Sequence, residues 1–498
     1  MNQLEKNSWQ QVLSVFQAIW GYDEFRKPQG EIVRNLLAGK DALIIMPTGG
    51  GKSICFQLPA LLQNGLTLVV SPLVALMENQ VQELQQKKLP AALLHSELSS
   101  FEKRKTLQNI AGQKLRLLYL SPETLLSPPV WEKISEPHLK INALILDEAH
   151  CLVQWGDTFR PAYRRLGAVR KALLKSKPSG EKISIAAFTA TADLAGQKII
   201  KEVLQLQQPE IYRLNPYRSN LSPKVHIAWT PRGRKQQLFN FVQKKSPNPG
   251  LVYVRTRSDS ENIAAWLEKK GYPTASYHAG LNAEERRRIE TQWLDGEIPF
   301  VVCTSAFGMG INKSNVRWVI HFHPPLLLSE YVQEIGRAGR DGLASDALML
   351  VSEPTGWLDP EDKQRQNFFT EKARSQLLNA EELIKKLPPT GNVAAVSQKL
   401  KDSALALSLL HSMGKLEWVD PFHYKINHNN LKGKRHKNIK HQQKSDASSH
   451  FKGQTHAIKN MKKYITTKNC RWQFLLDAFG FTQDAENWCC GHCDNCRK

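Results

Sequence analysis

Short apolar runs that alternate with amphipathic stretches constrain the fold of this chain more than any other feature. The pattern begins near residue 40. Five of the runs have the length and composition of buried strands, and they lie at residues 42–46, 66–71, 115–120, 143–150 and 184–191. Helical patterns lie between them, for example at residues 53–63 and 73–87. Strands that alternate with helices predict a largely parallel, doubly wound α/β sheet.

A second alternating series follows a break near residues 214–224. It contains strand-like runs at residues 250–254, 274–280, 300–305, 317–323 and 346–352. Helical patterns separate these runs at residues 260–271 and 283–296. The series predicts a second α/β domain of similar size, and a length of 498 residues agrees with two or more domains.

The charge balance points to a polyanionic partner. The chain has 68 Lys and Arg against 46 Asp and Glu, a net charge of +22. Nucleic acid is the simplest partner for such a surplus, and a merely solvated basic surface is the alternative. The chain has no apolar run of about 18 residues, and its first residues lack an apolar signal core. We therefore expect a soluble cytoplasmic protein, associated with the nucleoid in a cell without a nucleus.

A glycine-rich loop between a predicted strand and a predicted helix indicates a phosphate site. Residues 46–53 read MPTGGGKS, so Met46 stands where the strict phosphate-loop motif has glycine. The match is to the shorter TGxGK[ST] form. Backbone N–H groups in such a loop cradle phosphates, the lysine reaches the β- and γ-phosphates, and the Ser or Thr hydroxyl binds Mg²⁺. The candidate nucleotide-binding residues are Thr48, Gly49, Gly50, Gly51, Lys52 and Ser53.

Two acidic residues follow the predicted strand that ends at Leu146. Asp147 would hold Mg²⁺, and Glu148 would orient or deprotonate the attacking water. The pair is informative because a phosphate loop precedes it in the chain. Cys151, close behind, is interpreted as a core residue, since no partner motif for a nucleophile accompanies it.

Residues 333–342 of the second series read QEIGRAGRDG. Arg337 and Arg340 are three residues apart, a spacing that puts them on one side of a helix. One of them is a candidate arginine finger that reaches across an interdomain cleft, with Gln333 as a further catalytic candidate. Surface salt bridging is the alternative for these arginines.

The chain changes character after the second series. Residues 379–426 predict a helix that ends at Gly414, followed by two β-rich runs around the sequence DPFH. This pattern fits a winged helix-turn-helix, a frequent binder of duplex DNA, as well as it fits a generic small α+β packing module. Residues 431–463 contain ten Lys or Arg and one acid, which predicts a mobile basic linker.

Cysteines crowd the C-terminal end. Cys470, Cys490, Cys493 and Cys496 have the spacing C-x19-C-x2-C-x2-C. Four thiolates in this pattern suit a structural, tetrahedral Zn²⁺ site rather than a disulfide framework. Cys489 and His492 are competing ligands, and the regular spacing favours Cys490.

Together these motifs resemble the superfamily-2 helicases and, within them, the RecQ family of DNA helicases. The resemblance implies that Tyr22, Arg26 and Gln29, in the sequence GYDEFRKPQ, contact adenine. It implies two RecA-like parallel-sheet domains, ATP, Mg²⁺ and Zn²⁺ as cofactors, and DNA as the partner. Residues with family-like roles in strand tracking, coupling and contacts to DNA and ATP are 69–80, 119–126, 188–193, 301–313 and 333–342.

Residues 151–163, CLVQWGDTFRPAY, resemble the aromatic-rich loop of that family. By this resemblance Trp155 and Phe159 stack on unpaired bases, and Arg160 passes the signal toward the ATP site. The family usually has His-Asp after the sequence WG, whereas this chain has Asp157 and Thr158.

The predicted domain order is a first RecA-like domain at 1–214, a second at 215–355, a winged-helix-like or other small α/β region at 356–430, a basic linker at 431–463 and a zinc module at 464–498. In the better-known family layout the zinc module directly follows the second RecA-like domain. The resemblance implies an ATP-dependent helicase that moves 3′ to 5′ on single-stranded DNA and unwinds tailed or forked duplexes in repair and recombination. The alternatives are an RNA helicase of the DEAH type and a nucleotide-gated DNA-binding or annealing factor without robust unwinding.

Overall fold

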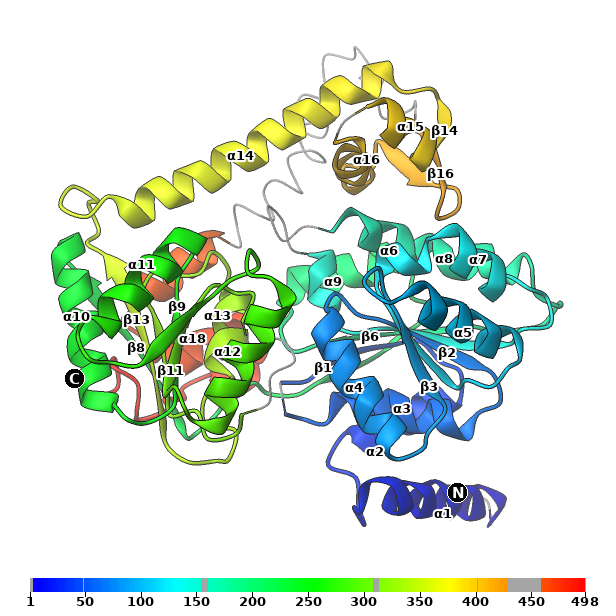
Figure 1. Ribbon diagram of the computed structural model, residues 1–498, viewed down its shortest axis with the longest axis horizontal. Coiled ribbons are helices and arrows are strands. Elements are labelled where there is room, and N and C mark those ends of the chain that lie inside the picture. Colours follow the sequence, from blue (N-terminus) through cyan, green and yellow to red (C-terminus); the bar gives the residue numbers. More distant parts are fainter. Residues whose placement is uncertain are drawn as a thin grey trace. The chain divides into compact units, whose positions relative to one another are not determined.

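The computed structural model describes residues 3–47, 49–153, 160–307, 313–400, 402–427 and 458–497. The chain divides into two compact units (Figure 1). The described residues of the first unit belong to Met1–Ala190, Ala195–Leu214 and Ser375–Ala447. Those of the second unit belong to Thr191–Leu194, Asn215–Arg374 and Ser448–Lys498. No helix in the described ranges has the length and apolarity needed to cross a lipid bilayer.

A seven-stranded parallel sheet forms the centre of the first unit, with the strand order β3-β4-β2-β5-β6-β1-β7. Its strands are β1 (Ala42–Ile45), β2 (Leu66–Val70), β3 (Ala91–Leu94), β4 (Leu117–Leu120), β5 (Ile141–Leu146), β6 (Ser184–Thr189) and β7 (Glu210–Arg213). The five strands expected from apolar runs are all present. Two more were missed, namely the short strand β3 and the edge strand β7, which is mostly exposed and has no apolar run.

Helices cover both faces of this sheet. Helices α2 and α3 lie on one face, and α6, α7 and α8 lie on the other (Figure 1). The bounds are α1 (Gln3–Trp20), α2 (Gln29–Leu37), α3 (Lys52–Leu62), α4 (Val74–Gln86), α5 (Ser100–Ala111), α6 (Pro122–Leu125), α7 (Pro128–Ile134), α8 (Val169–Leu174) and α9 (Leu194–Val203). Two 3₁₀ segments follow β5, namely η1 (Ala149–Leu152) and η3 (Pro161–Ala168).

The second unit contains a six-stranded parallel sheet with the order β10-β11-β9-β12-β13-β8. Successive residues of its strands enter separate cores: Leu251 and Tyr253 pack on one face, and Val252 and Val254 on the other. Burial on both faces explains the nearly continuous apolar runs. The bounds are β8 (Leu221–Ala228), β9 (Gly250–Tyr253), β10 (Thr274–Tyr277), β11 (Phe300–Cys303), β12 (Trp318–His321), β13 (Ser345–Ser352), α10 (Pro231–Lys245), α11 (Arg257–Glu268), α12 (Ala283–Asp295) and α13 (Leu328–Ile335).

The region after the second sheet has the element order of a winged helix. The long helix α14 (Glu361–Leu383) and the 3₁₀ turn η4 (Ile384–Lys386) are followed by β14 (Thr390–Asn392), α15 (Val393–Lys399), α16 (Ser403–Ser412), β15 (Leu416–Trp418) and β16 (His423–Ile426). The three strands form an antiparallel sheet with the order β14-β16-β15. This is the helix-plus-hairpin pattern expected from the sequence, with Gly414 in the left-handed conformation after the helix. The predicted linker lies mostly outside the described residues.

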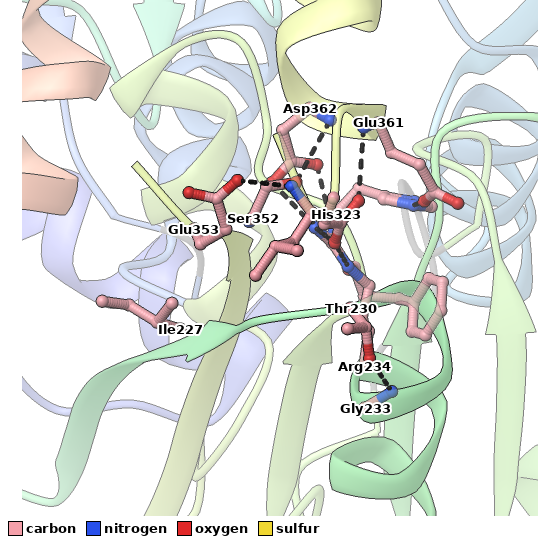
Figure 2. Close-up of polar contacts among 12 residues, drawn as sticks. Ile227, Thr230, Gly233, Arg234, His323, Ser352, Glu353, Glu361 and Asp362 are labelled. Atoms are coloured by element: carbon pink, nitrogen blue, oxygen red, sulfur yellow. Dashed lines mark hydrogen bonds and ion pairs between the residues drawn. The ribbon is translucent and has the colours of Figure 1, made fainter. Parts of the chain in front are cut away.

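A buried ionic cluster attaches the start of α14 to the second unit (Figure 2). Arg234 is fully buried, and its Nη2 lies 2.8 Å from Asp359 Oδ2 and 3.1 Å from Asp362 Oδ2. His323 Nε2 lies 2.8 Å from Glu361 Oε2. These pairs connect α10 and the end of β12 to the first turn of α14. Removing one partner would leave an uncompensated buried charge, so the start of this helix is firmly held.

Glu353, in the turn that leads to α14, gives a pH-dependent prediction. The Thr355 hydroxyl, helped by backbone N–H donors of Leu358, Thr355 and Trp357, lowers the pKa of Glu353 from 4.5 to about 2. A carboxylate with a depressed pKa stabilises the fold above its unfolded pKa and loses this effect as the pH falls toward the folded value. Glu353→Gln should therefore lower the Tm at neutral pH, and the gap to wild type should narrow below about pH 4.5. Thermal melts of both proteins between about pH 3.5 and 7 measure the difference in Tm. A Tm difference that does not vary with pH contradicts the prediction.

Candidate active site and metal centre

The glycine-rich loop connects the end of β1 to the start of α3, as the sequence predicts. The helix begins at Lys52, directly after Gly51. Gly49 and Gly51 have φ values of 84° and 76°, a left-handed conformation that favours glycine. The loop thus places backbone N–H groups at a helix N-terminus, where phosphate groups bind in other proteins. Thr48 lies outside the described residues.

Gln29 ties this loop to the preceding segment. Its side chain is buried, its Nε2 donates to Gly50 O at 3.0 Å, and its Oε1 accepts from Arg26 N at 3.0 Å. A Cβ on Gly51 would come within 2.3 Å of Gln29 Nε2, so a side chain there would displace Gln29. Tyr22 is 51% exposed, and Arg26 is also exposed. The structure brings Gln29 to the loop and leaves the other two side chains accessible to a ligand.

Lys52, Asp147 and Glu148 come together at the carboxyl end of the sheet. Lys52 Nζ is buried, has no hydrogen-bond partner among the described residues, and lies 3.9 Å from Glu148 Oε1. Asp147 and Glu148 are buried at the end of β5, and Asp147 N donates to Val70 O on the neighbouring strand. A buried ammonium without a close partner beside two carboxylates fits an anion together with a divalent cation.

The acidic pair is electrostatically unfavourable without a cation. Burial raises the pKa of Asp147 to about 6, the charge of Glu148 adds to the rise, and Lys52 opposes it. A divalent cation beside Asp147 would favour its ionised form and reverse this trend. The two buried carboxylates supply the oxygen ligands that Mg²⁺ prefers, and Ser53 is the hydroxyl of the loop expected to join them.

His150 connects this pair to the end of β6, a contact that sequence reasoning missed. His150 Nδ1 lies 3.0 Å from Glu148 Oε2 and 3.3 Å from Thr189 Oγ1. Thr189 belongs to residues 188–193, the segment that resembles the coupling motif of helicases. Glu148 itself has a φ of 53°, a strained conformation for a residue other than glycine. The histidine therefore links the carboxylate expected to act on water to that segment.

Cys151 behaves as a core residue. Its thiol is buried, and this burial raises its pKa to about 12. A thiol with such a pKa is protonated at neutral pH and is a poor nucleophile.

The aromatic-rich segment is only partly described. Trp155 and Phe159 lie outside the described residues, while Arg160 precedes η3. Arg160 Nη1 lies 3.7 Å from Glu123 Oε2, and both side chains are partly exposed. Glu123 belongs to residues 119–126, one of the segments that resemble strand-tracking motifs. An exposed pair of this kind contributes little stability, so it leaves Arg160 free to change partners.

In the second unit, the predicted helix does not extend to the two arginines. Helix α13 ends at Ile335, so Gln333 lies on it, whereas Arg337 and Arg340 lie in the turns that follow. Gly339, with a φ of 60°, shapes these turns, and a Cβ there would come within 2.5 Å of Asn220 Nδ2. The expectation of one helical face was therefore wrong. Burial, followed by the charge of Arg337, lowers the pKa of Arg340 to about 10.

Glu334 holds α13 in place, which sequence reasoning also missed. Its Oε2 lies 2.7 Å from His321 Nε2 and 3.1 Å from Arg255 Nη2, and the carboxylate is buried. Burial alone would raise the pKa of Glu334, but Arg255 and His321 hold it below its ordinary value. The ion pair fixes the helix next to Gln333. In the sequence, the only sign of this contact is Glu334 itself, which lies beside Gln333 in the motif QEIGRAGRDG.

The four predicted cysteines form one cluster. The Sγ atoms of Cys470, Cys490, Cys493 and Cys496 all lie within 4.8 Å of one another, and none forms a disulfide. A tetrahedral zinc ion with Zn–S bonds of about 2.3 Å separates its sulfur atoms by about 3.8 Å, so the cluster fits Zn²⁺. Cys489 is exposed and outside the cluster. His492 Nε2 instead lies 3.2 Å from Tyr217 OH.

The cysteine cluster is packed on the second unit. Residues 458–466 are helical, and α18 (Arg471–Ala478) and α19 (Thr482–Ala485) follow. Trp472 Nε1 donates to Leu221 O at 2.9 Å, and Asp494 Oδ2 accepts from Val225 N at 3.0 Å, so both residues bind the edge strand β8. Arg471, also buried, holds Asp494 with its Nε 2.9 Å from Oδ1.

Comparisons with known proteins agree with these features. A DEAD/DEAH box helicase family model matches residues 26–199, a helicase conserved C-terminal domain matches 233–342, and a RecQ zinc-binding family matches 433–497. A solved structure of S. cerevisiae Dbp5 bound to RNA and ADP BeF3 has a TM-score of 0.55 at 15% identity, covering 71% of this chain and 90% of that chain. At this identity the likeness shows the fold alone, and the fold is the expected pair of RecA-like domains.

Two relatives are closer in sequence. The match to the ATP-dependent DNA helicase RecQ of Synechocystis sp. has 49% identity over 487 residues and covers 98% of both chains. The match to the protein of the same name from Pasteurella multocida has 40% identity over 365 residues and covers 72% of this chain but only 56% of that protein. With both helicase domains, the zinc-binding domain and these relatives in agreement, the chain belongs to the RecQ family of ATP-dependent DNA helicases.

Proposed function

We propose that this chain hydrolyses ATP with Mg²⁺, moves 3′ to 5′ along single-stranded DNA and unwinds tailed or forked duplexes during repair and recombination. The buried Lys52 ammonium next to Asp147 and Glu148 is the observation that carries the proposal. This arrangement suits the phosphates and the metal ion of a nucleotide, and membership of the RecQ family makes DNA the track. The cytoplasmic, nucleoid-associated location of the protein stays a prediction.

Each residue around the loop then has a role. Tyr22, Arg26 and Gln29 bind adenine, and residues 48–53 hold the phosphates. Ser53 and Asp147 hold Mg²⁺, which neutralises charge that develops on the transferred phosphoryl group. Glu148 positions the attacking water and accepts its proton, with His150 fixing the carboxylate at 3.0 Å.

The second unit supplies the remaining polar groups. Gln333, Arg337 and Arg340 are candidates for stabilising the transition state, since a guanidinium matches the geometry of phosphate oxygens. Glu334 acts on them indirectly, because its pairs with Arg255 and His321 hold α13. Zn²⁺ at the cysteine cluster supports the C-terminal module and takes no part in hydrolysis.

The aromatic-rich segment provides a specific prediction. If Trp155 stacks on unpaired bases, Trp155→Ala should keep basal ATP hydrolysis and lose most of its stimulation by single-stranded DNA, since one stacked base contributes about 1–3 kcal/mol. ATPase assays with and without an oligonucleotide measure both rates. Trp229→Ala, which changes an exposed tryptophan of the second unit, is the matched control for losing an indole. Unchanged stimulation in the Trp155 variant would mean that this side chain only packs the segment.

One experiment tests the proposed function as a whole. ATP hydrolysis and strand separation are measured on duplexes with a 3′ or a 5′ tail, with RNA of the same sequence as a control. We expect stimulation by DNA and unwinding from the 3′-tailed duplex. Equal stimulation by RNA would favour the RNA helicase, because RNA readers use the 2′-OH, and hydrolysis without strand separation would favour a nucleotide-gated binding factor.

A further inference from the structure

The surfaces that a winged helix usually offers to DNA are occupied here by the first RecA-like domain. We call residues 390–426 the winged-helix module. Its third helix, α16, corresponds to the helix that enters the major groove in helix-turn-helix proteins. In this chain, α16 packs instead against η3, the segment Pro161–Ala168. Ser408 is fully buried, and its Oγ donates to Pro161 O at 3.1 Å.

The composition of α16 also argues against base recognition. Its sequence, SALALSLLHS, has no Lys, Arg, Asn or Gln, the side chains that make bidentate contacts with base edges in the major groove. Residues 406–410 are buried without interruption. Five consecutive residues span more than one helical turn, so this part of the helix is covered on all sides. One side faces the core of the module, and the other faces η3 of the first RecA-like domain.

The tip of the hairpin makes a second contact. Pro421 and Phe422 lie between β15 and β16, where a winged helix has its wing. Arg165 Nε donates to Pro421 O at 2.6 Å, and its guanidinium carbon lies 5.8 Å from the centre of the Phe422 ring. The Trp131 ring packs edge-on against Phe422 at 5.1 Å. Both the helix and the tip therefore bind the first RecA-like domain.

The segment on which the module docks, η3, overlaps the end of the aromatic-rich segment. η3 begins one residue after Arg160, at the end of the aromatic-rich segment that resembles the DNA-sensing loop. Its residues Arg165 and Ala168 contact the module, and Ala168 is part of the same apolar core as Leu407 and Leu410. The module thus fixes the chain just beyond the point where bases are expected to stack.

We propose that the winged-helix module holds Pro161–Ala168 in place. This contact positions the end of the aromatic-rich segment so that DNA binding stimulates ATP hydrolysis. The α16 helix and the hairpin tip of the module do not read duplex DNA. The expected effect on ATP hydrolysis rests on the proposed function, whereas the docking of the module on η3 does not. Ser408 and Phe422 are positioning residues that act through η3.

Two variants break the docking at separate points. Ser408→Arg places a charge in the buried contact with Pro161, and Phe422→Ala removes the ring that packs on Trp131 and Arg165. Glu417→Ala is the matched control, because Glu417 is exposed on β15 in the same small sheet. In the full-length protein, hydrogen exchange at residues 161–168 reports docking. Basal and DNA-stimulated ATPase rates and the Kd for blunt duplex DNA report function.

We expect faster hydrogen exchange at residues 161–168 in both variants, a stimulation ratio lowered about 10-fold, basal hydrolysis within about 2-fold of wild type, and an unchanged Kd for blunt duplex. This fold-change corresponds to about 1.4 kcal/mol, the coupling of one modest contact. Faster hydrogen exchange at residues 161–168 with an unchanged stimulation ratio would overturn the proposal that the module positions the aromatic-rich segment. Unchanged exchange in both variants would overturn the docking, and weaker binding of blunt duplex would restore the DNA-reading role. If wild type shows no stimulation by DNA, the proposed function fails, while the exchange data still decide the docking.

Discussion

Replacing Lys52 with alanine is expected to lower ATP hydrolysis by at least about 100-fold, the usual cost of losing one charged donor to a transition state. The structure gives the reason: Lys52 Nζ is buried, lacks a hydrogen-bond partner among the described residues and lies 3.9 Å from Glu148 Oε1. Strand separation should disappear with hydrolysis.

The same substitution should leave the fold intact, which separates a catalytic loss from unfolding. Deleting the ammonium leaves Asp147 and Glu148 without the cation that opposes their repulsion, so the Tm should fall modestly while the protein stays folded at the assay temperature. Lys198→Ala is the matched control, since Lys198 is exposed on α9 and pairs only with Glu202 at 3.8 Å. ATPase rates and thermal melts of both variants measure these outcomes. A Lys52 variant that keeps more than about a tenth of the wild-type rate would contradict the assigned role.

The periodicity of the sequence was sufficient to predict the two large sheets but not their edge strands. Strands such as β5 and β9 are buried on both faces, so they appear as apolar runs. β8 was missed because its sequence, LSPKVHIA, mixes polar and apolar residues. This strand lies at the edge of its sheet, where Trp472 and Asp494 cover it. Cover supplied by residues about 250 positions later leaves no local pattern.

The candidate site followed a similar rule. Motifs contiguous in sequence, such as residues 46–53 and the pair Asp147 and Glu148, could be predicted because neighbouring residues carry the chemistry. The contact of His150 with Thr189 and that of Glu334 with His321 could not, since each joins a helical segment to a strand that lies elsewhere in the sequence. The spacing of the cysteines left Cys489, Cys490 and His492 open, and only the backbone of the final turns places Cys490 at the cluster.

The separation between the second sheet and the zinc cysteines looked like a rearrangement in the sequence alone. The match to the Synechocystis relative covers 98% of both chains, so the long intervening region is shared with that protein. The structure explains how such a region is tolerated: the start of α14 is held by Arg234 in the second unit, and the module after it packs on η3 in the first. The zinc module still reaches the edge strand β8.

Cys493→Ser is expected to abolish zinc binding and to release the C-terminal module from β8. Cys493 is completely buried at the centre of the cluster, with its Sγ 3.5 Å from Cys496 Sγ. A hydroxyl is a poor ligand for Zn²⁺, and a structural zinc site contributes its binding free energy directly to folding. The zinc content should fall from about one ion per chain to nearly none, and the Tm should drop by about 10 °C if several kcal/mol are lost.

Cys489→Ser is the matched control, because Cys489 neighbours a ligand yet is exposed and lies outside the cluster. Metal analysis and thermal melts of the two variants provide the comparison, and protease cleavage after residue 457 reports release of the module. The docking contacts through Trp472 and Asp494 connect metal loss to the second unit, so cleavage should accelerate only in the Cys493 variant. Equal zinc contents in both variants would show that the four clustered thiols are not the ligands, whereas zinc loss in the Cys489 variant alone would assign the metal to the exposed thiol.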